Sequence, residues 1–345
     1  MSRLICILFF LSPYFLFGQN IKKVLFIGNS YTYVNDLPTM LQQLALTMGD
    51  SINKDSYTMG GYTLQMHATD PSCLAKINSQ KWNYVIIQAQ SQEPSFDPDT
   101  VAVYTYPYAQ TLVNQVKAND SCSQVLFYMT WGRKNGDAMN CASYPIVCTY
   151  EGMQYRLRQS YIEMATNNNA QVSPVGVSWR TIRQTDTTIE LYQTDESHPS
   201  ISGTFVAACT FYSAIFQKPI SSTFVPIGVD TIQAATIKQI SSDIVLDSLT
   251  TWKIDTTIAP CILSGLIEPN LQNHISIFPN PFSSTINFSE EFSGQIVITD
   301  IFGRIKFEKI VEKQNSIELT NLASGIYFIS LISTNVSRTY EVIRF

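Results

Sequence analysis

The 345-residue chain has few charged residues and few histidines, and both shortages limit what it can do. Asp, Glu, Lys and Arg make up 14 % of the residues, and the formal net charge is −5. No run of basic residues is present, which argues against nucleic acid as a partner. The three histidines form no cluster, and no Cys-x-x-Cys pair occurs, so we expect neither a metal site nor another cofactor.

A long apolar run occurs only at the start of the chain. Arg3 gives a short positive start, residues 4–17 are apolar, and Gly18-Gln19 offers a cleavage point. This pattern predicts a signal peptide over residues 1–19. The alternative is a membrane anchor, but Pro13 interrupts the run. We expect export with the segment removed and no membrane-spanning segment in the mature chain.

Six of the seven cysteines lie after the predicted signal peptide. An even number in an exported protein permits disulfides but does not dictate their pairing. Cys141 and Cys148 bracket Ala-Ser-Tyr-Pro-Ile-Val, a small loop that a disulfide could close. Cys209 lies in an apolar helical run and is expected to be a buried thiol.

Strand and helix patterns alternate over residues 20–258. Strand alternating with helix at this spacing predicts an α/β domain whose parallel sheet of about five strands has helices on both faces. The expected strands are 24–27, 51–59, 84–88, 124–131 and 171–179, and the expected helices include 105–119, 152–168, 200–215 and 230–253.

The last part of the chain has a different pattern. Residues 259–272 are rich in Pro, Asn, Gly and Ser and predict a linker. From residue 275 the apolar residues follow period two in seven short runs separated by turn residues. This pattern predicts a separate small all-β sandwich domain over residues 273–345.

Ser30 lies where an open α/β sheet places its chemistry. The apolar run 24–27 predicts a strand buried on both faces, and Gly28-Asn29 ends it. Ser30 therefore follows the carboxyl end of a strand, and amides at the start of the next helix can face a developing negative charge. The alternative is an ordinary strand-to-helix turn.

A serine nucleophile needs a base, and His198 is the best placed of the histidines. It follows Asp195 by three residues on a loop, so the carboxylate can hold the imidazole by its second nitrogen. His67 has no carboxylate at useful spacing, and His274 lies at the linker boundary. An Asp-x-x-His alone also fits a surface loop, but with Ser30 it predicts a Ser30–His198–Asp195 triad.

These motifs resemble the SGNH (GDSL-like) hydrolases over about residues 22–220. Gly28-Asn-Ser-Tyr-Thr32 resembles the first block, with Asn29 where Asp is commoner, and Asp195-Glu-Ser-His198 resembles the last block. Gly61-Tyr-Thr63 resembles the second block, whose glycine gives an N–H to the oxyanion hole beside that of the serine, here Ser30. The resemblance implies a three-layer α/β/α flavodoxin-like fold with a five-stranded parallel sheet.

The third block departs from the usual Gly-x-Asn-Asp. The chain has Gln88-Ala-Gln90-Ser-Gln-Glu-Pro94 after the strand, which resembles the glutamine-bearing branch that includes sialate and acetylxylan esterases. We expect the Gln88 amide to complete the oxyanion hole, with Gln90 as second choice. The alternative is that these glutamines satisfy the backbone at the strand end.

The resemblance implies a secreted serine esterase that removes small acyl groups, acetyl foremost, most naturally from carbohydrates. Two alternatives stay open. One is a general short-chain carboxylesterase or lysophospholipase of the same family. The other is a non-catalytic surface module that binds glycans on a degenerate hydrolase fold.

The C-terminal segment resembles the type A sorting domain of the bacterial type IX secretion system. The matching stretches are Ile277-Phe-Pro-Asn-Pro281, Asp300-Ile-Phe-Gly-Arg304, Leu322-Ala-Ser-Gly-Ile-Tyr327 and Tyr340-Glu-Val-Ile-Arg-Phe345. The resemblance implies a Bacteroidetes-like source, the type IX machinery as a partner, and a secreted or cell-surface location. The domain should be dispensable for catalysis.

Overall fold

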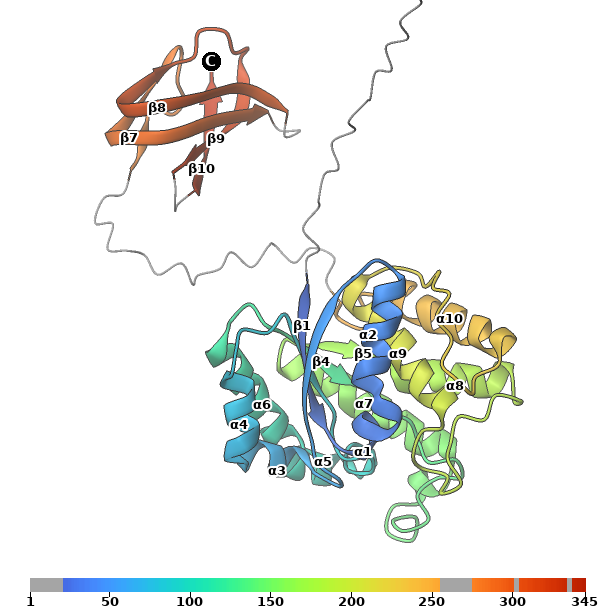
Figure 1. Ribbon diagram of the computed structural model, residues 1–345. Coiled ribbons are helices and arrows are strands. Elements are labelled where there is room, and N and C mark those ends of the chain that lie inside the picture. Colours follow the sequence, from blue (N-terminus) through green and yellow to red (C-terminus); the bar gives the residue numbers. More distant parts are fainter. Residues whose placement is uncertain (1–20, 255–274, 301–303, 334–336) are drawn as a thin grey trace, which may run out of the picture. The chain divides into compact units, whose positions relative to one another are not determined.

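The structure is a computed structural model that describes residues 21–254, 275–300, 304–333 and 337–345. The described residues form two compact units, one before and one after residue 263 (Figure 1). The predicted signal peptide, the predicted linker 259–272 and His274 lie outside the described residues.

The N-terminal unit is built on a five-stranded parallel sheet in the order β2-β1-β3-β4-β5. Parallel strands need crossover connections, and the helices supply them. The fold class expected from the sequence is confirmed. The strands are β1 (Lys22–Gly28), β2 (Ile52–Thr58), β3 (Tyr84–Ile87), β4 (Gln124–Tyr128) and β5 (Gln171–Ser173).

Helices cover both faces of this sheet. Figure 1 shows α2, α9 and α10 on one face and α3, α4 and α6 on the other. The helices are α1 (Ser30–Tyr33), η1 (Val34–Asp36), α2 (Leu37–Thr47), α3 (Leu64–Thr69), α4 (Pro71–Asn78), η2 (Glu93–Ser95), α5 (Pro98–Tyr104), α6 (Tyr106–Asn119), η3 (Pro145–Cys148), α7 (Tyr150–Asn167), α8 (Val175–Thr185), α9 (Ile201–Phe216) and α10 (Thr231–Leu246).

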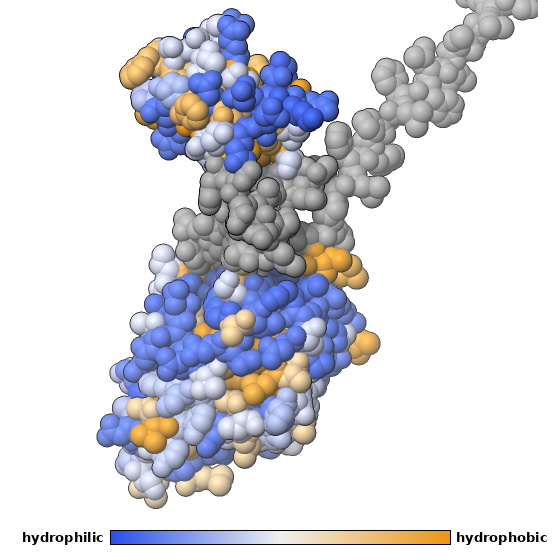
Figure 2. All heavy atoms as spheres, turned by 90° about the vertical axis from the view of Figure 1, so that its left-hand side faces the viewer, coloured by the Kyte–Doolittle hydropathy of each residue, from blue (hydrophilic) through white to orange (hydrophobic). Residues whose placement is uncertain are grey.

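The sheet forms the core, because β1 is buried along Val24–Gly28 and β3 is buried along its whole length. Each apolar side chain taken fully out of water contributes about 1.5–3 kcal/mol. Helix α9 is buried over nearly its whole length and contains Cys209 as a buried free thiol, as expected. The side that Figure 2 shows is largely hydrophilic, with only scattered apolar spots.

Three expected elements end earlier than the sequence pattern suggested, and one of them, the strand expected over residues 124–131, ends at Tyr128. The predicted strand 171–179 is wrong after residue 173, because Pro174 ends β5 and α8 begins at Val175. The expected helix 230–253 ends at Leu246. Trp252 then turns back, and its carbonyl accepts a hydrogen bond from the Val172 N–H (2.9 Å), which extends the edge of β5.

The C-terminal unit is all-β, as expected, and its strands are antiparallel. The strand order is β10-β9-β7-β6, with β8 paired to β7. The expectation of seven short strands is wrong for the described residues, because β7 and β8 each continue through a bulge that the pattern had separated. The strands are β6 (Ile277–Phe278), β7 (Thr285–Asp300), β8 (Ile305–Glu318), β9 (Gly325–Ile332) and β10 (Ser337–Arg344).

Candidate active site

The turn after β1 presents Ser30 at the carboxyl end of the sheet's central part. Asn29 caps α1, and its side-chain oxygen accepts a hydrogen bond from the Tyr31 N–H at 3.1 Å. Ser30 is the first residue of α1, so its own N–H has no acceptor within the helix. Its side chain is partly exposed. The amide of Ser30 is therefore free of an intrahelical partner.

The structure brings together the three residues that the sequence predicted as a triad. Ser30 Oγ lies 2.8 Å from His198 Nε2. The other ring nitrogen, His198 Nδ1, forms a hydrogen bond with Asp195 Oδ2. A serine, an imidazole and a carboxylate in this order are the arrangement that activates a serine hydroxyl.

The loop Asp195–His198 is closed by its own hydrogen bonds. Asp195 Oδ1 accepts the N–H groups of Ser197 (3.1 Å) and His198 (3.0 Å), and Glu196 takes a left-handed conformation with φ 59°. Burial opposes ionisation of Asp195, but the hydrogen bonds from His198 and Ser197 outweigh it and hold the pKa of this carboxyl below its usual range. Asp195 is thus ionised where it faces the imidazole.

Two aromatic side chains brace this loop, and sequence reasoning missed both of them. Tyr31 stacks on Trp131, with ring centroids 4.7 Å apart, and meets His198 edge-on at 5.5 Å. The Tyr31 hydroxyl lies 2.7 Å from Ser197 Oγ, and Trp131 Nε1 donates to the Ser197 carbonyl at 3.1 Å. Tyr31 directly follows Ser30, and Trp131 lies at the end of the predicted strand 124–131. These two positions were the only sequence features that could have pointed to them.

The turn containing Gly61 is tied to the turn containing Ser30. The Gly28 carbonyl accepts hydrogen bonds from the Met59 N–H (3.1 Å) and from His67 Nε2 (3.0 Å), and Asn29 Nδ2 donates to the Tyr62 carbonyl at 3.2 Å. Gly61 has φ +73° and is exposed. These hydrogen bonds hold the turn that contains Gly61 beside the turn that contains Ser30.

His67 is held neutral inside the fold. Its side chain is fully buried, and burial lowers its pKa to about 4. The ring donates to the Gly28 carbonyl, so Nε2 carries the proton. His67 therefore supports the turn from behind and does not face the solvent as a base would.

Gln88 lies in a different place from the one expected for an oxyanion donor. Its side chain is fully buried. Its amide nitrogen donates to Asn29 Oδ1 (2.9 Å) and to the Ala89 carbonyl (2.5 Å), so both amide hydrogens are engaged inside the protein. The physical reason is Gly28, where a Cβ would lie only 2.6 Å from Gln88 Oε1. The Gln88 side chain folds into that space instead of reaching the surface.

Gln90, the second choice, is partly exposed and keeps donor capacity. Its Oε1 accepts the N–H groups of Gln92 (2.6 Å) and Glu93 (3.1 Å). Its amide nitrogen has one long contact, 3.4 Å to Gln92 Oε1. One amide hydrogen of Gln90 is therefore left without an acceptor among the described residues.

A loop after β4, residues 132–149, borders the site and carries the disulfide Cys141–Cys148, which confirms the pairing suggested by the sequence. Its centre is Asp137, whose buried carboxylate accepts from Gln92 Nε2 (2.9 Å) and from Asn140 Nδ2 (2.7 Å). The Lys134 N–H donates to the Glu196 carbonyl at 2.9 Å. The loop thus joins the third block to the loop that carries His198.

No group of three or more His, Cys, Asp and Glu side chains in the described residues is arranged to hold a metal ion. Within the same residues, no helix has the length and hydropathy needed to cross a membrane.

The comparisons with known proteins agree with this architecture. Residues 276–343 match the family described as "Secretion system C-terminal sorting domain". A DUF4886 family protein from Bacteroides uniformis ATCC 8492 aligns with a TM-score of 0.58 and 18 % identity, over 66 % of this chain and 95 % of that chain. No curated protein matches the chain.

Two further solved structures are similar at lower TM-scores. A putative SGNH hydrolase from Slackia heliotrinireducens has a TM-score of 0.46 and 24 % identity, over 56 % of this chain and 98 % of that chain. An acetyl xylan esterase variant from Geobacillus stearothermophilus has a TM-score of 0.40 and 17 % identity, over 59 % of this chain and 97 % of that chain.

The sorting-domain match identifies the C-terminal unit and the destination of the chain. Domains of this family mark proteins that the type IX secretion system releases or carries to the cell surface. The N-terminal unit shares its α/β fold with the DUF4886 family protein from Bacteroides uniformis. The chain is thus a secreted or cell-surface protein whose N-terminal unit has an α/β fold.

Proposed function

We propose that the chain is a serine esterase that hydrolyses small acyl esters, acetyl esters foremost, on carbohydrates. The observation that carries the proposal is the 2.8 Å separation of Ser30 Oγ and His198 Nε2, with Asp195 bound to the other ring nitrogen. A protein that only binds glycans does not need a serine, a histidine and an aspartate in this order, whereas acyl transfer to the serine depends on a base that takes its proton.

In the proposed mechanism Ser30 Oγ attacks the ester carbonyl while His198 Nε2 takes the hydroxyl proton. His198 then returns that proton to the departing alcohol, which leaves an acyl group on Ser30. Water attacks the acyl-serine while His198 takes a proton from it, and His198 returns that proton to Ser30 Oγ as the acid leaves. Asp195 keeps the proton of His198 on Nδ1 and stabilises the imidazolium that forms in each half-reaction.

The oxyanion of each tetrahedral intermediate would be bound by three donors. Two are the backbone N–H groups of Ser30 and Gly61. The third in this proposal is the side-chain amide of Gln90, because both amide hydrogens of Gln88 are already engaged. Removing one such donor typically lowers turnover by about 10²- to 10³-fold.

The openness of the site supports a carbohydrate ester over a lipid. The side chains of His198 and Asp195 are 32 % and 47 % exposed, so a bulky polar alcohol can reach them. Export also places the protein where polysaccharides are met. The proposed domain roles follow: residues 1–19 and the sorting domain direct export, and residues 20–258 perform catalysis.

The proposal is tested by hydrolysis of p-nitrophenyl acetate, butyrate and octanoate by the full chain and its Ser30→Ala variant. Preference for acetate, with activity lost in the variant, supports the proposal. Preference for octanoate would instead favour the general carboxylesterase or lysophospholipase. A matched control is Ser72→Ala, which changes an exposed serine on α4 and should leave all three rates unchanged.

A further inference from the structure

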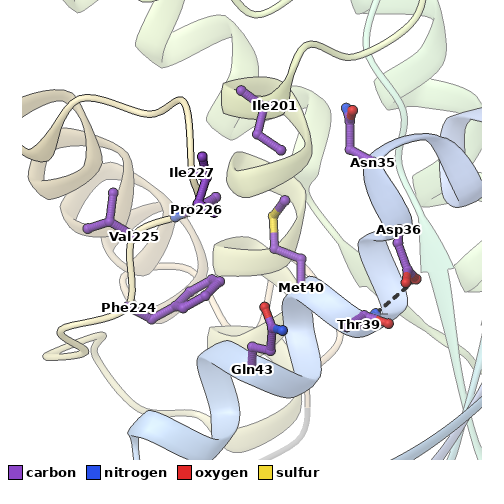
Figure 3. A pocket seen from close by; sticks show the side chains of 10 residues that line it. All are labelled: Asn35, Asp36, Thr39, Met40, Gln43, Ile201, Phe224, Val225, Pro226 and Ile227. Carbon is purple, nitrogen blue, oxygen red and sulfur yellow. Dashed lines mark hydrogen bonds between the residues drawn. The ribbon is translucent and has the colours of Figure 1, made fainter.

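A cavity of about 330 Å³ is lined by Asn35, which follows Ser30 by five residues, and by Ile201, which follows His198 by three. It lies between η1 and α2 on one side and the segment 224–227, which connects α9 to α10, on the other (Figure 3). Ile201, the first residue of α9, closes one end. The volume is at the lower end of the range of about 300–1,000 Å³ for small-molecule sites.

The two walls of the cavity differ in chemistry. One wall is polar and consists of Asn35, Asp36, Thr39 and Gln43. The opposite wall is apolar and is formed by the segment Phe224–Ile227, with Met40 between the two walls (Figure 3). A ligand that fits both walls has one apolar face and one face rich in hydroxyl groups, which describes a sugar ring.

The charge and the exposure of the lining residues restrict the class of ligand further. Asp36 is the one charged residue that lines the cavity, so an anionic ligand would be repelled while hydroxyl donors would be accepted. An aliphatic acyl chain would strip water from the polar wall without replacing its hydrogen bonds. Ile227 is 98 % exposed at the rim, so its side chain is accessible to a ligand.

Asn35 connects the cavity to the catalytic histidine. Its side-chain amide donates to the Pro199 carbonyl (3.0 Å) and to Thr204 Oγ1 (2.9 Å), and Pro199 directly follows His198. Asn35 and Asp36 both take left-handed backbone conformations, with φ 57° and 50°. Such conformations cost non-glycine residues about 1–2 kcal/mol each, and here they turn Asn35 toward Pro199.

We infer that this cavity is a subsite for a neutral sugar unit of the substrate, which holds the glycan while a neighbouring acetyl ester lies at Ser30. The inference rests on the proposed esterase function and names its substrate class. The Phe224–Ile227 wall packs on the apolar face of the ring, and the polar wall binds its hydroxyl groups. Neutral acetylated oligosaccharides are therefore the substrates that gain binding contacts in the cavity.

The test compares two exposed lining residues with two matched controls in the full chain. Ile227→Ala and Gln43→Ala change the subsite. Ile232→Ala and Gln110→Ala change exposed residues of the same types on α10 and α6, outside the lining. The substrates are p-nitrophenyl acetate, which is too small to fill the subsite, and acetylated xylo-, manno- and cello-oligosaccharides.

The subsite variants should lower kcat/KM for the best oligosaccharide by about tenfold, mainly through KM, and change p-nitrophenyl acetate hydrolysis by less than about twofold. The controls should change neither. The inference is overturned if both substrates fall equally, if neither falls, or if no oligosaccharide is hydrolysed while p-nitrophenyl acetate is. Failure of the esterase proposal shows separately, as p-nitrophenyl acetate activity that survives Ser30→Ala.

Discussion

Gln88 and Asn29 exchange two hydrogen bonds, one in each direction, both 2.9 Å long. The Asn29 N–H donates to Gln88 Oε1, and Gln88 Nε2 donates to Asn29 Oδ1. Thr32 Oγ1 donates to the same Gln88 oxygen at 2.9 Å. The pair joins the end of β3 to the turn that carries Ser30, so the position of Ser30 depends on a buried side chain from the neighbouring strand.

Replacing Gln88 by methionine should therefore damage both stability and activity. The change leaves the Asn29 N–H and the Thr32 hydroxyl without their partner in a buried site, and each such group costs about 1–3 kcal/mol. We expect the free energy of unfolding to fall by about 3 kcal/mol in urea titrations and kcat/KM to fall at least tenfold. Gln110→Met, on the exposed side of α6, is the control, and an unchanged Gln88→Met protein would contradict the account.

Gly61→Ala separates backbone strain from catalysis. Gly61 and Gly49 have similar backbone angles, φ +73° and +76°, and an added Cβ meets nothing within 4 Å at either position. Both substitutions should cost about 1–2 kcal/mol in stability, because alanine avoids this conformation. Only Gly61→Ala should also lower kcat, because alanine avoids this conformation and the resulting backbone shift would turn the Gly61 N–H, a proposed oxyanion donor, away from its position. Equal kcat values in the two variants would contradict the proposed role of the Gly61 N–H.

Asp195→Asn should lower kcat by about 10³- to 10⁴-fold with little loss of stability. The asparagine oxygen can still accept the Ser197 and His198 amides, whereas its NH₂ group would face His198 Nδ1 and favour the wrong tautomer. Kinetics with p-nitrophenyl acetate and thermal unfolding measure the two effects. The control is Asp99→Asn on α5, and full activity in Asp195→Asn would exclude Asp195 from the triad.

Glu93→Gln should alter how stability depends on pH. Burial raises the pKa of Glu93 from 4.5 to about 7, and its Oε2 is buried without a hydrogen-bond partner among the described residues. Between these pH values the folded state keeps a proton that the unfolded state releases, so stability is lost as pH rises through 7. The Glu93→Gln variant has no ionisable group at this position, so its stability does not show this decrease.

The difference in unfolding free energy between Glu93→Gln and the unmodified chain should therefore grow by up to about 3 kcal/mol from pH 4.5 to pH 8. Urea titrations at several pH values measure it. A difference that stays constant with pH would show that Glu93 ionises normally in the folded protein.

The sheet and the predicted triad could be read from the sequence because their signals are local. The buried run before Gly28 marks β1, and the spacing of Asp195 and His198 marks a loop that closes on itself. The disulfide Cys141–Cys148 was also readable, since the two residues bracket a short loop.

The parts that the sequence did not predict depend on contacts between distant segments. The space left by Gly28 takes up the Gln88 side chain, which comes from another strand, and so removes it from the surface. Tyr31 and Trp131 meet only when β1 and β4 lie in one sheet. The prediction of a strand beyond residue 173 was wrong for a local reason. The apolar residues after Pro174 fit a buried helix as well as a strand.

The most direct test of the account is covalent labelling of the full chain by a fluorophosphonate, followed by mass-spectrometric mapping of the labelled residue. The probe reacts with a serine only when a neighbouring base has activated it. One label per chain is expected, on Ser30, and it should be lost in His198→Ala. Labelling of another residue, or labelling of Ser30 that does not depend on His198, would contradict it.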